Sequence, residues 1–302
     1  MDARITKQRL GNMLAYDWLK IIGVIALAAV FFSMFFMMIG TRPTDGQTFY
    51  VYAYDGVSVG ADFSELETSM KSQGVFGYDI LKTGSENFTS NGMYGNTVFN
   101  SRRGAGEGRV LFISDIRKEE NGKVSSKLLN FIDYEGTPRE SFGFCIDPQE
   151  FLQDCRTYLE TFFGEDLAGE INQAQVREAF LARNKKDARF RTAKKKEKGV
   201  ALEAQRLELL KKDYLYVISQ IGQSLDYVTY TSEIKTHIIG FSMKALNLTP
   251  LVYYTEEVEG EKVQKNSEIA LCIFNNGTRE KDLKYETVNF LAYLSRTYGT
   301  EQ

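Results

Sequence analysis

The run from Ile21 to Ile39 contains nineteen residues and no charged side chain. As an α-helix it would be about 30 Å long, at about 1.5 Å per residue, which matches the hydrocarbon core of a bilayer. A soluble helix of this length keeps a polar face, whereas Ser33 is the only polar side chain in this run. The sequence therefore predicts a transmembrane helix over residues 21–39.

The residues on either side of this run predict its orientation in the membrane and whether it is cleaved. The tail, residues 1–20, carries four basic and two acidic side chains, so it is expected to stay in the cytoplasm, with the rest of the chain outside the cell. A cleaved signal peptide also has basic residues before an apolar run. Its apolar region, however, spans only about 7–15 residues and leads to a small-residue cleavage site, which Gly40-Thr41-Arg42-Pro43 lacks. We therefore expect an uncleaved signal anchor in the cell membrane.

Residues 40–47 would form a short tether, and residues 48–302 an extracytoplasmic domain. This length suits one large domain or two modest ones with a proper core. The alternation of aromatic and small residues in Thr48–Tyr54 predicts a strand, and the apolar centre of Arg109–Asp115 predicts a strand buried on both faces. Between these strands we expect a helix from Asp62 to about Ser72. The fold class predicted is α/β.

Further elements follow from capping and periodicity. Asp147-Pro148 should open a helix, because Asp can cap and Pro suits the first turn. The other predictions, in chain order, are a strand at Tyr78–Lys82, an end of the capped helix near Gly164, two long helices over residues 170–220 with a break near Gly199, a helix at Ser232–Ala245, a hairpin of Leu251–Thr255 with Ile269–Phe274, and a final helix at Tyr285–Tyr298.

The helical segment at 170–220 is strongly basic. Residues 177–198 carry ten Lys or Arg and three acids, in a chain whose net charge is -3. Lys194, Lys195 and Lys196 could contact anionic lipid headgroups, cell-wall polymers or an acidic partner. The alternative is a solvated helical face on which Arg189 and Arg191 pair with neighbouring acids. No nucleic-acid partner is expected outside the cell, where stacking aromatic residues are also few in this segment.

Residues that could carry chemistry are sparse. Cys145, Cys155 and Cys272 lack metal-ligand spacing, and two alternatives stay open for the first two: a local disulfide or buried thiols. His237 is the only histidine, which leaves zinc little support. No metal or cofactor is expected.

Two glycine patterns resemble motifs of enzymes and nucleotide-binding proteins. Gly56-Val-Ser-Val-Gly60 matches the G-x-S-x-G of a nucleophile elbow, with His237 as the available base. The predicted helix, however, begins some four residues after Ser58, so we expect a glycine-bounded loop. Gly104-Ala-Gly-Glu-Gly108 precedes a strand, whereas phosphate-binding loops lie between a strand and a helix. We expect a tight loop there, and a protein that is not an enzyme.

Part of the chain resembles a known family. Leu251 to Tyr298, with "SEIALCIFNNGT" and "YETVNFLAYL", resembles the closing segment of extracellular solute-binding proteins of bacterial ABC importers, whose Phe-Leu-x-x-Leu pattern corresponds here to Phe290, Leu291 and Leu294. The segments "TFYVYAYDG" and "GEGRVLFISD" resemble the first lobe of that fold. The opening "MDARITKQRLGNMLAYDWLKI" is similar to that of uncharacterised single-pass membrane proteins of clostridia-like Gram-positive bacteria.

The resemblance implies a two-lobed, periplasmic-binding-protein-like ectodomain. It implies a non-catalytic function as a membrane-anchored solute-binding or transporter accessory protein, whose partners are the bilayer, a membrane transporter and a small solute. By fold analogy Tyr54, Asp55 and Asp115 would lie at strand ends and contact the ligand. Two other functions stay open: an assembly partner that docks onto another envelope protein through its basic helices, and an envelope hydrolase that uses Ser58.

Overall fold

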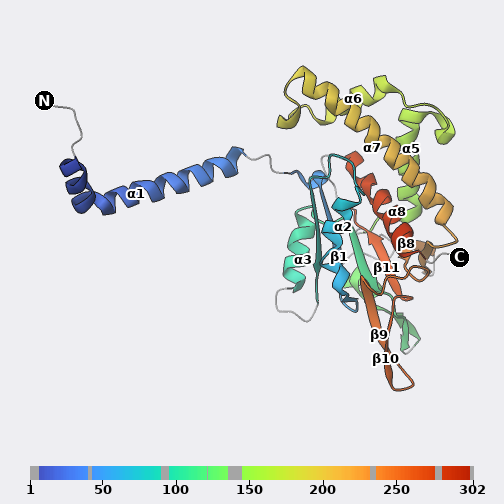
Figure 1. Cartoon of the computed structure of the whole chain (residues 1–302). Coiled ribbons are helices and arrows are strands. Elements are labelled where there is room, and N and C mark those ends of the chain that lie inside the picture. The colour runs from blue at the N-terminus through green and yellow to red at the C-terminus, as the bar shows by residue number, and fades with distance from the viewer. Residues whose placement is uncertain are drawn as a thin grey trace. The chain divides into compact units, whose positions relative to one another are not determined.

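A computed structural model describes residues 7–39, 43–89, 95–120, 122–134, 145–231, 236–275 and 281–299. The chain divides into two compact units, residues 1–42 and 43–302 (Figure 1). The first unit contains one described helix, α1 (Lys7–Ile39). Its stretch from Trp18 to Phe35 is long and apolar enough to cross a membrane, and none of that stretch is buried within the chain. The helix predicted at residues 21–39 is thus present and begins earlier, within the tail.

The second unit, which we call the body, is built on a six-stranded mixed sheet. Three neighbouring strands are parallel, and the next three alternate in direction. Across the sheet the strands are β3 (Lys82–Asn87), β1 (Thr48–Ala53), β4 (Val110–Ser114), β11 (Ile269–Ile273), β8 (Thr236–Ser242) and β7 (Asp226–Thr231). The mixed α/β class predicted from the sequence is confirmed.

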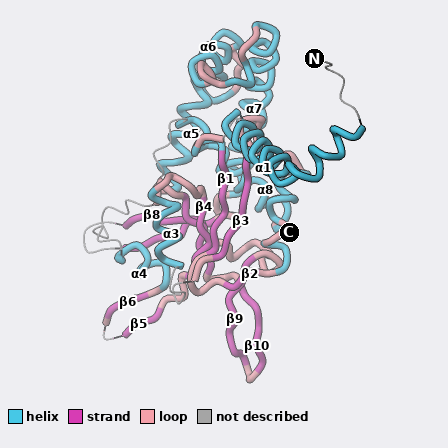
Figure 2. Tube along the Cα trace, turned by 90° about the vertical axis from the view of Figure 1, so that its left-hand side faces the viewer, coloured by secondary structure: helices cyan, strands magenta, loops and turns pink. Residues whose placement is uncertain are grey.

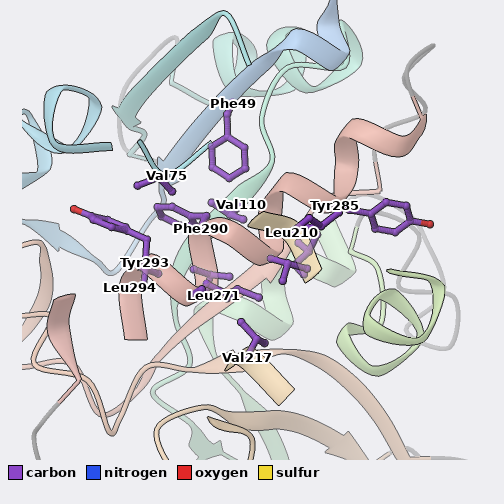
Figure 3. Close-up of a cluster of buried hydrophobic side chains, with 14 of the residues drawn as sticks. Phe49, Val75, Val110, Leu210, Val217, Leu271, Tyr285, Phe290, Tyr293 and Leu294 are labelled. Atoms are coloured by element: carbon purple, nitrogen blue, oxygen red, sulfur yellow. The ribbon is translucent and has the colours of Figure 1, made fainter. Parts of the chain in front are cut away.

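Helices cover both faces of this sheet, which explains why the central strands read as continuous apolar runs. Alternate residues of β1 point to opposite faces: Phe49 and Val51 enter one hydrophobic cluster, and Tyr50 and Tyr52 enter the other. The first cluster includes α2 (Leu66–Ser72), α5 (Pro148–Phe163), α7 (Ala193–Gln220) and α8 (Glu286–Tyr298); the second includes α3 (Gly95–Gly104) and α4 (Lys127–Tyr134). In Figure 3, Phe49 lies over Phe290 of α8, with ring centroids 5.3 Å apart.

Smaller elements extend from this core. The hairpin of β9 (Val252–Val258) and β10 (Glu261–Lys265) projects away from the six-stranded sheet, and β2 (Ser58–Val59) pairs with its base (Figures 1 and 2). The remaining elements are η1 (Asp45–Gln47), η2 (Ala61–Phe63), β5 (Lys118–Glu120), β6 (Lys123–Ser125), η3 (Glu165–Leu167), α6 (Gln173–Arg183), η4 (Ala188–Phe190) and η5 (Lys281–Tyr285).

Several predicted elements are confirmed. β1 and β4 occupy the predicted stretches and are fully buried. Asp147 caps α5, because its side chain accepts hydrogen bonds from the N–H groups of Gln149 and Glu150, and the helix ends before Gly164 as expected. The last helix, α8, lies where it was predicted.

Three predictions differ from the structure: one helix, the start of one strand and the pairing of one hairpin. A helix was expected at Ser232–Ala245, but Thr236–Ser242 form β8, where Ile239 and Phe241 fill opposite faces of the sheet; residues 232–235 lie outside the described residues. The strand expected at Tyr78–Lys82 begins only at Lys82, because the Asp79 side chain turns into a buried ion network. The strands expected at Leu251–Thr255 and Ile269–Phe274 are present as β9 and β11, but they do not form a hairpin with each other: β9 pairs with β10, and β11 lies between β4 and β8.

The break in the helical segment also lies elsewhere than predicted. Residues 184–192 separate α6 from α7, and Gly199 lies inside α7. A Cβ at Gly199 would lie 2.1 Å from the Phe180 ring of α6. The glycine therefore permits close helix packing and does not end a helix.

Two buried arginines join the helical segment to the sheet core. Arg206 of α7 is fully buried, and its guanidinium contacts Glu203 at 2.8 Å and Glu286 of α8 at 3.0 Å. Arg183 of α6 pairs with Asp79 at 2.7 Å and also with Glu203. The network thus connects α6, α7, α8 and the chain before β3.

The two carboxyls that Arg206 contacts differ in their ionisation. Burial opposes the charge on Glu203, but Arg206 and Arg183 together outweigh it and lower the pKa of Glu203 to about 2. Burial raises the pKa of Glu286, and Arg206 offsets that only in part. Glu203 is therefore the anion on which the network most depends.

Candidate functional site

The chain leaves two neighbouring parallel strands toward opposite faces of the sheet. After β1 it forms α2 on one face of the sheet, and after the parallel neighbour β4 it forms α4 on the other face. In open α/β sheets, ligands bind outside the carboxyl ends of the strands at such a switch point. Tyr54 and Asp55 follow β1, and Asp115 follows β4, with the Tyr54 N–H bonded to the Phe112 carbonyl at 2.9 Å. The structure therefore places the three predicted residues at adjacent strand ends.

Asp115 is buried and holds neighbouring elements in place. Its carboxylate accepts hydrogen bonds from Ser126 Oγ at 2.6 Å and from Arg117 Nε at 2.9 Å. Ser126 Oγ also accepts from the Leu129 N–H at 3.0 Å, at the start of α4. The guanidinium of Arg117 donates to the Thr229 carbonyl at 2.7 Å. Asp115 thus positions α4 and the chain after β4.

Asp55 is the more accessible carboxylate of the site. It pairs with Lys127 Nζ at 2.6 Å, and Lys127 is the first residue of α4. The Lys127 side chain is 52% exposed and that of Asp55 17%, so water and solutes can reach the pair. Because the lysine is exposed, solvent screens this pair and it should contribute only about 1 kcal/mol.

Tyr54 forms the aromatic side of the site. Its ring centroid lies 5.0 Å from that of Phe99 on α3 and 5.3 Å from that of Phe131 on α4. The side chain is half-buried, so two helices hold the ring while part of it remains exposed. An aromatic face, a carboxylate and an ammonium group therefore meet at this edge of the sheet.

Lys127 and Ser126 were not singled out from the sequence. Ser126 precedes the apolar pair Leu128 and Leu129, which is the pattern of a helix N-cap and could have located α4. The pairing of Lys127 with Asp55 joins residues 72 positions apart and has no local signal.

The glycine patterns are only partly the loops that were expected: the first contains the short strand β2, and the second begins at the last residue of α3. Ser58 is exposed and lies within β2, which pairs with β9, so it is not at a strand-to-helix turn. His237, the base considered for it, lies on β8 of the other sheet. Gly106 and Gly108 have positive φ angles and lead from α3 into β4. A Cβ at Gly108 would lie 2.5 Å from the Tyr52 ring, which requires glycine there.

The cysteines are free and buried. Cys155 lies in the cluster on one face of the sheet and Cys145 in the cluster on the other, so the local disulfide left open by the sequence is not formed. Burial raises the pKa of Cys155, and a hydrogen bond with Cys145 together with burial raises that of Cys272. Within the described ranges, no group of three His, Cys, Asp or Glu residues could hold a metal ion.

The basic segment has paired and unpaired cations. Arg189 pairs with Asp187 at 2.7 Å and with Asp79 at 2.6 Å, as the alternative of neighbouring acids expects. Lys194, Lys195 and Lys196 are exposed in the first turn of α7. Arg191 is exposed too and makes no ion pair with a residue that the structure describes.

Two open hollows lie away from the switch point. One, of about 670 Å³, is lined by Phe163 and Ile171 together with Glu208 and Lys211 of α7. The other, of about 590 Å³, lies at the start of α5. Neither is lined by Tyr54, Asp55 or Asp115. Comparison of the chain with protein-family models, with curated proteins and with solved structures finds no match.

Proposed function

We propose that this protein is a membrane-anchored, non-catalytic binding protein of the cell surface, which contacts a small polar solute at the carboxyl ends of β1 and β4. The observation that carries this proposal is the accessible Asp55–Lys127 pair at the switch point of the sheet, beside the half-buried Tyr54 ring. Asp115 would act as a positioning residue there, since its oxygens already accept from Ser126 and Arg117.

The chemistry of the site suggests the class of solute. A molecule that carries both an ammonium and a carboxylate group, such as an amino acid or short peptide, can satisfy Asp55 and Lys127 at once. The Tyr54 ring would cover its apolar part. Such a ligand exchanges one ion pair for two and leaves no charge without a partner.

The anchor adds a partner to this proposal. A body joined to a membrane helix serves a fixed neighbour, and a membrane transporter is the partner that the resemblance to solute-binding proteins implies. That resemblance includes β1 and β4, which form the site; a second lobe is not needed for a ligand to bind at this edge. With the basic tail in the cytoplasm, the body would lie outside the cell.

Ligand binding predicts a thermal shift. The full chain in detergent micelles, screened against amino acids, short peptides and sugars, is expected to gain about 5–10 °C in Tm with a zwitterionic ligand at about 100 times its Kd. Asp55→Asn and Lys127→Gln should each abolish most of that gain. Differential scanning calorimetry would measure it.

The matched control is Asp154→Asn, which removes an exposed carboxylate that also pairs with a lysine, the half-buried Lys284, at 3.2 Å. It should leave the ligand-induced shift unchanged. Stabilisation that survives both Asp55→Asn and Lys127→Gln would place the ligand elsewhere, and a screen in which no compound stabilises the chain would contradict solute binding.

The proposed orientation predicts accessibility to protease. Treatment of intact cells with an added protease should degrade the body and spare the tail at residues 1–20, as detected with a tag at each end. The control is cells opened by detergent, in which both ends become accessible. A body that stays protected in intact cells would reverse the orientation.

A further inference from the structure

The connection between α6 and α7 packs against the start of the body. Arg189 in this connection pairs with Asp79 at 2.6 Å, and two residues after Asp79 the Leu81 N–H donates to the Gln47 carbonyl at 2.9 Å. Gln47 directly precedes β1 and lies four residues after Pro43, the first residue of the body. The connection therefore lies at the amino end of β1, where the chain arrives from α1.

Exposed cations gather on this connection and the first turns of α7. None of them forms an ion pair with a residue in the part of the chain that the structure describes. This basic cluster consists of Lys185, Lys186, Arg191, Lys194, Lys195, Lys196 and Lys198.

The placement of three of these lysines is unfavourable for the helix itself. The amino end of a helix carries a partial positive charge, which favours acids in the first turn and disfavours cations. The first turn of α7 contains no acid and includes Lys194 and Lys195, with Lys196 next to them. An anion supplied from outside the chain would offset this repulsion.

The link between the apolar helix and the body is short. From Ile39 to Pro43 the chain can span at most about 14 Å. The sequence predicted a tether through residue 47, but the residues from Pro43 onward belong to the body. Arg109 holds them there, because its guanidinium donates to the Asp45 carbonyl at 2.8 Å and to the Thr48 carbonyl at 3.3 Å. The body is thus tethered by a short link to any bilayer that holds α1.

The opposite end of the body carries the opposite charge. The β9–β10 hairpin projects from the end of the sheet that lies away from α6 and α7 (Figures 1 and 2). Its exposed residues include Glu256, Glu257, Glu259 and Glu261. An anionic surface would attract one end of the body and repel the other.

We infer that the basic cluster docks onto anionic lipid headgroups of the bilayer that holds α1. Docking would fix the body with the β9–β10 hairpin pointing away from the membrane. Lipid is favoured over an acidic protein because the link from Ile39 to Pro43, at most about 14 Å long, tethers the body to the bilayer itself. The inference depends on the proposed anchor but not on the proposed solute.

The test measures the distance of the cluster from lipid headgroups. The full chain is reconstituted into nanodiscs, and a fluorophore is attached to Ala193→Cys, an exposed position at the start of α7; the native thiols are buried and should not react. Nitroxide-labelled headgroups in discs rich in phosphatidylglycerol should quench this label strongly. Salt at about 1 M, which shortens the Debye length to about 3 Å, should relieve the quenching.

A second label and two charge variants make the test specific. A fluorophore on Glu261→Cys at the hairpin should not be quenched. Replacing Lys194, Lys195 and Lys196 by Gln should lower the ratio of docked to undocked body about 100-fold, at about fivefold per lysine. The matched control replaces three exposed lysines elsewhere, Lys118, Lys244 and Lys262, and should leave the ratio unchanged.

Equal quenching of the two labels, or quenching that persists in discs of phosphatidylcholine alone, would overturn the inference. Quenching that is unchanged when Lys194, Lys195 and Lys196 are replaced by Gln would overturn it too. A chain that fails to co-purify with the discs would overturn the anchor and the docking together. A solute that still shifts Tm in that case would show that the proposed binding function stands independently.

Discussion

Arg206→Met is expected to lower the free energy of unfolding of the body by about 3–5 kcal/mol. The substitution preserves most of the side-chain volume but removes the cation that contacts Glu203 at 2.8 Å and Glu286 at 3.0 Å, all three side chains being fully buried. Glu203 would keep only Arg183 as a cationic partner. For a body of this size the loss corresponds to roughly 6–20 °C in Tm, measured by circular dichroism on the full chain.

The control is Arg177→Met on the same helical segment. Arg177 pairs with Glu197 at 2.6 Å, but both side chains are more than half exposed, so the loss should stay below about 1 kcal/mol. Equal effects of the two substitutions would show that burial does not make the Arg206 network costly to break.

The pH dependence identifies the carboxyl responsible. The pKa of Glu203 is about 2 in the folded body against an ordinary value of 4.5, so its ionised form stabilises the fold above about pH 4.5. That contribution is lost as the pH falls from 4.5 toward 2. The difference between the wild type and Arg206→Met should therefore shrink over this interval, in acid titrations followed by circular dichroism.

The central strands could be predicted because their environment is uniform. β1, β4 and β11 are covered by helices on both faces, so nearly every residue is apolar and the run itself is the signal. β7 and β8 lie toward the edge, where residues such as Thr236 are exposed and the apolar run is interrupted. Short mixed segments of this kind fit a helix and a strand about equally well.

The sequence predicted where the candidate site lies in the sheet but not which side chains contact its three residues. Tyr54, Asp55 and Asp115 follow recognisable strands, and parallel strands bring their carboxyl ends to one edge. The side chains that contact Asp55 and Asp115 include Lys127 and Ser126, at the start of α4. Glu203 and Arg206 lie three residues apart on α7, a spacing that an exposed helical ion pair would also have. Pairings set by tertiary contacts leave no trace in local periodicity. For this reason the buried network was missed.

Gly199→Val is expected to destabilise the body by about 2–3 kcal/mol. The added Cβ would lie 2.1 Å from the Phe180 ring and 2.9 Å from that of Phe190, and both rings are buried between α6 and α7. Replacing a helical glycine gains a few tenths of a kcal/mol in propensity, which is too little to offset the displacement of two rings. Urea denaturation of the full chain would measure the difference.

Gly104→Val on α3 makes the same chemical change where no other atom lies within 4 Å of the added Cβ, so it should be nearly neutral. If Gly199→Val were equally mild, α6 could move on α7 without cost, and the contact at Phe180 would not hold the two helices together. A large cost would instead mean that the connection from residue 184 to 192 is held rigidly on the amino end of β1. The basic cluster can orient the body on a membrane only if that connection is rigid.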